Sequence, residues 1–110
     1  SAQAAIFDGR PLVALRDARN ARSLDPLALE PLLAEAAALE QLRDFQGARS
    51  LYIDAVELQP LNWRAWFELG RFEEGQQDWP RALPALRRAV DLDPQNPLTQ
   101  AELAAAEKAS

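Results

Sequence analysis

Apolar residues recur along most of this chain at intervals of three and four, and this spacing predicts a succession of amphipathic helices. Leu51, Ala55 and Leu58 form one such run, and Leu86 and Val90 belong to another. Residues spaced in this way share one face of a helix. The pattern predicts seven helices, near residues 2–7, 11–24, 28–42, 45–58, 63–75, 79–92 and 97–108. The predicted fold class is therefore all-α.

Polar residues and prolines mark the borders of these helices. Asp44 and Asp78 precede two of the predicted helices, and Asn62 and Asn96 precede two others. The side-chain oxygens of Asp and Asn at such positions accept hydrogen bonds from the free N–H groups of the first helical turn. Prolines, which cannot continue a helix, follow three of the helix ends, at residues 26, 60 and 94.

The chain also repeats itself with a period of 34 residues. The identical pairs at this spacing are Glu40 and Glu74, Asp44 and Asp78, Ala48 and Ala82, Ala55 and Ala89, Val56 and Val90, Leu58 and Leu92, Pro60 and Pro94, and Asn62 and Asn96. A second shift places Ala14, Ala21, Leu24 and Pro26 on Ala48, Ala55, Leu58 and Pro60. A fixed period of this length indicates stacked helical repeats, each of which buries its apolar face only against its neighbours.

Residues 63–96 resemble the tetratricopeptide repeat, whose pattern opens W-x2-L-G-x2-Y and continues with A-x3-F, an Ala and a Pro. The matching residues are Trp66, Leu69, Gly70, Ala82, Ala89 and Pro94. Two positions depart from the pattern, with Glu73 in place of Tyr and Leu86 in place of Phe. The resemblance implies a right-handed superhelix of antiparallel helix pairs, in which the motif residues maintain the shape and do not contact a ligand.

This resemblance extends over the whole chain as a single domain, 1–110, which we expect to be a fragment of a longer array. Residues 29–62 form one repeat with a degenerate first helix, and residues 63–96 form the fuller repeat. Residues 1–26 resemble the end of an earlier repeat, and residues 97–110 the first or capping helix of a later one.

A repeat superhelix binds its partners mainly in a concave groove lined by the first helix of each pair. Helical periodicity selects the face of each first helix that lies opposite the motif residues. The predicted partner-binding residues are Glu30, Leu33 and Ala37 in the second repeat, and Arg64, Phe67, Glu68, Arg71 and Glu74 in the third. The alternative is that these charges are simply solvated.

The charge distribution bears on the kind of partner. The chain has 17 acidic and 12 basic residues, a net charge of -5, and its acidic residues gather on the first helices while arginines gather on the second. We therefore expect a protein or peptide partner that is apolar with some positive charge. Nucleic acid is not an expected partner, because its phosphates need Lys and Arg to neutralise them. A groove that clamps a C-terminal carboxylate is not expected either, since Leu33 and Ala37 occupy positions where such repeats carry polar residues.

No chemistry is predicted for the chain itself. It contains neither His nor Cys, so the commonest general bases, nucleophiles and transition-metal ligands are missing. We predict no catalytic residue, no metal site and no cofactor, and no membrane insertion, because no apolar run reaches the roughly 18 residues that a membrane helix needs. An arginine cluster formed by Arg81, Arg87 and Arg88 is interpreted as a solvated face, given Asp91 and Asp93 beside it.

Three hypotheses on function remain open. The first is a non-catalytic interaction scaffold, which would be cytoplasmic if the protein is a soluble adaptor. The second is an accessory tail of a membrane enzyme of cell-surface polysaccharide assembly, because the Arg- and Ala-rich segments 27–43, 48–60 and 66–72 resemble the repeat-containing tails of bacterial O-antigen ligases; that tail would be extracytoplasmic. The third is self-association through the terminal partial repeats, with apolar residues around Ile6, Phe7 and Leu15.

Overall fold

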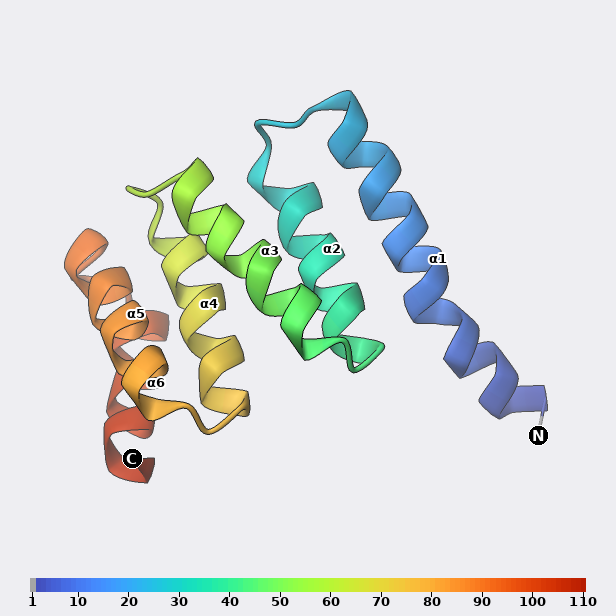
Figure 1. The fold of residues 1–110 in the computed structure, drawn as a ribbon. Helices are drawn as coiled ribbons and strands as arrows, with labels where there is room; N and C mark the ends of the chain where they lie inside the picture. Colours follow the sequence, from blue (N-terminus) through green and yellow to red (C-terminus); the bar gives the residue numbers. More distant parts are fainter. Residues whose placement is uncertain (1) are drawn as a thin grey trace. The chain divides into compact units, whose positions relative to one another are not determined.

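The computed structural model describes residues 2–110, with side chains from residue 9 onward. Its helices are α1 (Ala2–Leu24), α2 (Leu29–Gln41), α3 (Phe45–Leu58), α4 (Trp63–Gly75), α5 (Trp79–Leu92) and α6 (Pro97–Ala109). No strand interrupts them in this part of the chain, so the all-α prediction is confirmed (Figure 1). The segments 2–7 and 11–24 are one continuous helix, because Pro11 is accommodated inside α1 and does not end it.

The chain divides into two compact units, Ser1–Asp54 and Ala55–Ser110. The first unit contains α1, α2 and most of α3, and the second contains the end of α3 and all of α4, α5 and α6.

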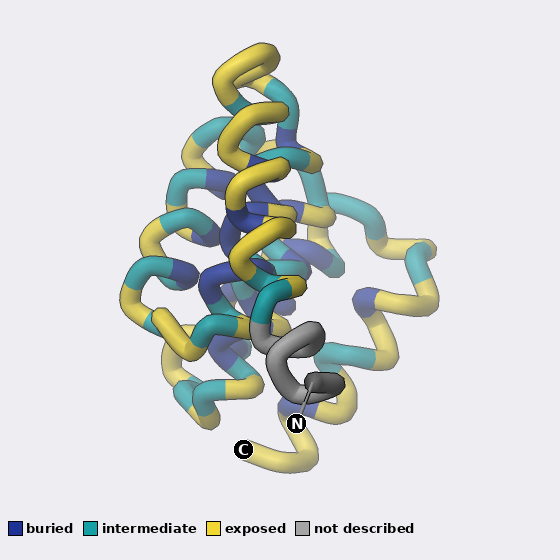
Figure 2. The backbone as a smooth tube through the Cα atoms, turned by 90° about the vertical axis from the view of Figure 1, so that its right-hand side faces the viewer, coloured by how far each residue is buried: buried dark blue, intermediate teal, exposed yellow. Residues whose placement is uncertain are grey.

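In the first unit, α1 contacts α2, and the two helices run antiparallel (Figure 1). The side of α1 that faces inward carries Leu15, Ala18 and Arg22, which follow one another at intervals of three and four residues. The outward turns of α1 are exposed (Figure 2). Helix α2 is covered on most sides; its buried residues are Leu29, Leu32, Leu33, Glu35, Ala36, Ala38 and Leu39. The position of Arg22 on the buried side of α1 brings its charge toward α2.

In the second unit, α5 contacts both α4 and α6, and α6 also reaches α4. Phe67 of α4, Leu86 and Ala89 of α5 and Ala106 of α6 form the buried cluster where the three helices meet. Its partly buried neighbours are Trp63, Trp66, Trp79, Leu83 and Leu103. The rings of Trp63 and Phe67 meet edge to face with their centroids 5.9 Å apart, a favoured arrangement for aromatic side chains.

The four polar residues predicted to begin helices do so, and this prediction is confirmed. The backbone N–H of Gly47 donates to Asp44 Oδ1 at 2.9 Å. The side chains of Asn62, Asp78 and Asn96 accept from backbone N–H groups at 3.0, 3.3 and 2.9 Å respectively. Each cap satisfies an N–H group that has no partner within its own helix.

The 34-residue period is visible in the backbone as well. Arg43 and Gln77, which are 34 positions apart, both adopt the left-handed conformation, with φ of 63° and 57°. In the second unit, the indole Nε1 of Trp66 donates to the carbonyl oxygen of Pro60 at 2.8 Å, and the side-chain amide of Gln100 donates to that of Pro94. Both members of this second pair lie 34 positions beyond those of the first, so the same hydrogen bond ties two successive first helices to the loops that precede them.

Gly70 permits the close approach of α4 and α5. A Cβ atom at this position would lie 2.6 Å from Leu86 Cδ2 and 3.2 Å from the Leu86 backbone nitrogen. Leu86 is fully buried, so its side chain has no free space into which it could move. The repeat pattern therefore has Gly at this position because of helix packing.

We predict that Gly70→Ala lowers the free energy of unfolding by about 1–3 kcal/mol, the usual cost of adding a methyl group to a packed core. The matched control is Gly75→Ala in the same helix, because nothing lies within 4 Å of a Cβ atom there. This control should leave stability unchanged or raise it by up to about 1 kcal/mol, since Ala favours helix more than Gly does. Urea unfolding followed by circular dichroism measures both, and equal stability of the two variants would contradict the packing role of Gly70.

Candidate functional site

The charged side chains predicted for α4 lie outside the core of the second unit. Arg64 and Arg71 are exposed and Glu68 and Glu74 are partly buried, at intervals of three and four residues along one side of the helix. We call these four residues the α4 strip. Within it, Arg71 Nη2 lies 3.2 Å from Glu68 Oε2, an ion pair between successive turns.

Phe67, which was predicted as a fifth contact on α4, is only 6% exposed. Its ring belongs to the buried cluster with Leu86, Ala89 and Ala106. The periodicity of α4 alone did not reveal this, because α6 is what completes the cover over the ring. Phe67 therefore supports the α4 strip from the core, and we no longer count it among the contact residues.

The residues predicted on α2 belong to the first unit and differ in their exposure. Glu30 is exposed and Ala37 is half-buried, whereas Leu33 is 6% exposed and belongs to the core. Glu40, in the same helix, is engaged inside the unit: the hydroxyl of the fully buried Tyr52 donates to its Oε1 at 2.8 Å. Of the three predicted residues, Glu30 is the charged one and the most exposed.

Leu15, predicted to contribute to an exposed apolar face for self-association, is 8% exposed and therefore contributes no such face. The side chains of Ile6 and Phe7 lie outside the described residues.

The α4 strip ends in a pair of carboxyl groups that the sequence interpretation did not single out. Glu102 of α6 forms a side-chain hydrogen bond with Glu74. Burial, this hydrogen bond and the negative charge of Glu102 together raise the pKa of Glu74 from 4.5 to about 7, while the charge of Arg71 opposes the rise. Glu74 Oε1 is buried and accepts no hydrogen bond from any described residue. Glu74 therefore keeps its proton in part of the molecules at neutral pH.

The period of 34 explains why this carboxylate lacks a donor. Glu74 corresponds to Glu40, and Leu86 corresponds to Tyr52. In the earlier repeat the tyrosine hydroxyl satisfies the glutamate; in the later repeat a leucine occupies the equivalent position and has no hydroxyl to donate. The same period places Glu102 at the position of Glu68. The repeat alone could therefore have predicted Glu102 as a site residue.

The sequence profile of the tetratricopeptide repeat family matches residues 33–97, which is more than half of the chain. The chain belongs to the tetratricopeptide repeat family. This match covers most of α2 and all of α3, α4 and α5, and therefore includes the α4 strip and the carboxylate Glu40 together with its tyrosine partner.

Solved structures with the same fold include other tetratricopeptide repeat domains. The first such domain of Spaghetti (RPAP3), bound to the HSP90 peptide SRMEEVD, superposes with a TM-score of 0.77 at 23% identity, over 94% of this chain and 82% of that chain. The human RPAP3 domain gives a TM-score of 0.79 at 23% identity, with the same coverage. The OM64 domain of Arabidopsis gives 0.77 at 23% identity, over 98% of this chain and 89% of that chain. At these identities the likeness shows the fold.

The Glu74 carboxyl group predicts a pH dependence of stability. Because its pKa is raised in the folded protein, the folded state holds this proton more tightly than the unfolded state does. The resulting contribution to stability is fully present below pH 4.5 and is lost as the pH rises to about 7. We expect Glu74→Gln, whose amide does not titrate, to lose less of its melting temperature between pH 5 and 8 than the unmodified protein does.

The control for this experiment is Glu107→Gln, which changes an exposed carboxylate on α6 to the same amide. It should keep the pH dependence of the unmodified protein. Parallel melting curves of all three proteins, recorded every half pH unit, would contradict the assignment if Glu74→Gln and Glu107→Gln behaved alike.

Proposed function

We propose that this domain is a non-catalytic protein-interaction module, and that the first helices of its second unit, α4 and α6, bind a partner peptide or helix. The observation that carries the proposal is that α4 has one set of residues that pack in the core and another set that lies outside it. The motif residue Gly70 and the neighbouring Phe67 serve the packing of the unit, whereas the α4 strip lies outside the core. Side chains that are held in place by a repeat scaffold but not needed for its packing are suited to contact a partner.

The charges of the second unit favour a partner with a positive group. Glu68 and Arg71 neutralise each other as an ion pair, whereas Glu74, with its pKa raised to about 7, is still partly ionised at neutral pH beside Glu102. A lysine or arginine of the partner placed beside these two carboxyl groups would be attracted by their negative charge. Such a contact also favours loss of the Glu74 proton, because a nearby positive charge lowers the pKa of a carboxyl group.

Leu residues of the same partner would pack on the apolar stems and rings beside the strip. Trp63 and Trp66 are partly buried at the margin of the core cluster. A partner with apolar residues on one face and a basic residue at its edge therefore fits both features. The HSP90 peptide in the RPAP3 complex contains three acidic residues, and we expect this chain to bind such a peptide more weakly than a basic one.

We predict that the domain binds a 14-residue amphipathic helical peptide with Leu on one face and two flanking Lys, measured by fluorescence anisotropy. The same peptide with Glu in place of Lys, and the peptide SRMEEVD, should bind at least tenfold more weakly, a difference of about 1.4 kcal/mol. Equal binding of the basic and acidic peptides would contradict the proposed charge preference.

The binding surface is tested by Glu102→Arg, which should weaken binding of the basic peptide about tenfold, because it replaces an attraction by a repulsion. Asp91→Arg is the matched control, since it makes the same change of charge at an exposed position on the second helix α5. If Asp91→Arg weakened binding as much as Glu102→Arg, the effect would be one of net charge, and the assignment to the first helices would be wrong.

The alternative function, an accessory tail of a membrane enzyme of surface-polysaccharide assembly, stays a prediction about a longer protein. None of the helices in the described part of the chain is both long and apolar enough to cross a membrane.

A further inference from the structure

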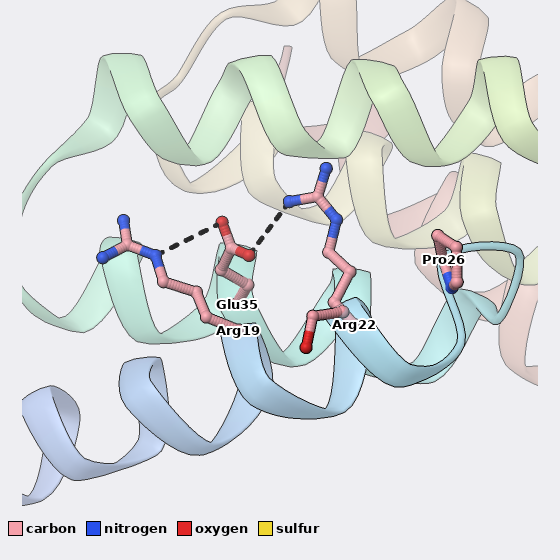
Figure 3. Close-up of a pocket in the computed structure, with 5 residues that line it drawn as sticks. Arg19, Arg22, Pro26 and Glu35 are labelled. Atoms are coloured by element: carbon pink, nitrogen blue, oxygen red, sulfur yellow. Dashed lines mark hydrogen bonds and ion pairs between the residues drawn. The ribbon is translucent and has the colours of Figure 1, made fainter.

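The first unit contains a second concentration of charge, which the proposed function does not use. A cavity of about 340 Å³ that is widely open to solvent is lined by Arg19, Arg22, Ser23, Pro26 and Glu35 (Figure 3). Three of these residues come from the end of α1, one from the following loop and one from α2. The cavity is therefore built where α1 turns toward α2.

Glu35 is the buried member of this group, with a side chain that is 7% exposed. It stands 34 positions before Leu69, so a carboxylate occupies a position at which the family pattern has leucine. Arg22 Nη1 donates to Glu35 Oε1 at 2.9 Å, and Arg19 Nε lies 3.8 Å from Oε2. A carboxylate buried to this extent requires a paired positive charge, which Arg22 supplies with good hydrogen-bond geometry.

The second arginine gives the cavity a net positive charge. Two guanidinium groups face one carboxylate, which leaves one positive charge that Glu35 does not neutralise. Each guanidinium carries five N–H donors. In the described part of the chain, neither arginine forms an ion pair with any acidic residue other than Glu35, so most of these donors remain for a ligand.

The other lining residues do not compete for these donors. The hydroxyl of Ser23 donates to the carbonyl oxygen of Asn20 at 2.7 Å, so its hydrogen points away from any ligand. Pro26 contributes only an apolar ring and a carbonyl group. Figure 3 shows the Glu35 carboxylate between the two guanidinium groups, and this placement fixes their directions.

We propose that this cavity binds an oxyanion, a carboxylate or a phosphate, through Arg19 and Arg22, with Glu35 as the residue that positions both. Guanidinium groups match the planar or tetrahedral oxygens of such groups with paired N–H donors. The volume lies at the lower end of the range for small-ligand sites, so the cavity admits the oxyanion together with a small attached body. This inference does not depend on the proposed partner of the first helices.

The test is a titration of the whole chain, followed through the Nε–Hε resonances of its arginines at constant ionic strength. Inorganic phosphate is one probe, and the dipeptide N-acetyl-Asp-Glu-amide is the other. We expect saturable shifts of the Arg19 and Arg22 resonances with at least one probe. Tighter binding of phosphate would indicate a phosphate-bearing small molecule, and tighter binding of the dipeptide would indicate acidic side chains of a protein as the source of the oxyanion.

Arg19→Gln is the decisive variant. Arg19 is 58% exposed, and its substitution leaves the Arg22–Glu35 pair intact, so we expect the variant to keep the fold. It should weaken binding of the preferred probe at least fivefold. Arg16→Gln is the matched control, since Arg16 lies on the same helix, is 68% exposed and pairs with Asp17 instead. Shifts that never saturate, or equal losses in the two variants, would overturn the proposal.

Discussion

The contact between Gly70 and Leu86 sets the distance between α4 and α5. The residue at position 86 also bears on the hydrogen bonding of Glu74. With Gly70 in α4, a leucine side chain is buried against the helix backbone. In the preceding repeat the position equivalent to Leu86 is Tyr52, which is equally buried but extends a hydroxyl to Glu40. The same helical framework thus satisfies one glutamate and leaves its counterpart, Glu74, without a donor.

The pKa of Glu74 reflects this environment. Burial of the Glu74 carboxyl group removes water, and the Glu102 carboxyl group from α6 adds a hydrogen bond and like charge. The raised pKa of Glu74 is the consequence. In the first unit, Glu35 replaces an apolar residue of the family pattern, and two arginines form ion pairs with it at the cavity. The site around Glu35 thus arises where the sequence departs from the pattern of its family, where local inconsistency is expected to accompany function.

Much of the fold could be predicted from the sequence, because helix ends and the repeat period are local or periodic signals. Asp44 and Asn62 mark helix starts through hydrogen bonds to residues two or three positions away. The continuity of α1 was not predicted, since Pro11 is usually a helix breaker but is tolerated inside this helix. The burial of Phe67 also escaped prediction, because it depends on the cover supplied by α6 from 30 to 40 residues further along the chain.

The two charged sites differ in how far the sequence could have located them. The pairing of Glu74 with Glu102 was accessible through the 34-residue period, which aligns Glu102 with Glu68. The grouping of Arg19 and Arg22 around Glu35 was not accessible in this way, because it depends on the packing of α1 against α2. The most direct measurement of the central claim is a ¹³C titration of the side-chain carboxyl carbons in the whole chain. A midpoint near pH 7 for Glu74 is expected from its burial and its carboxyl neighbour. A midpoint near 4.5 would show that Glu74 is solvated and would contradict the account.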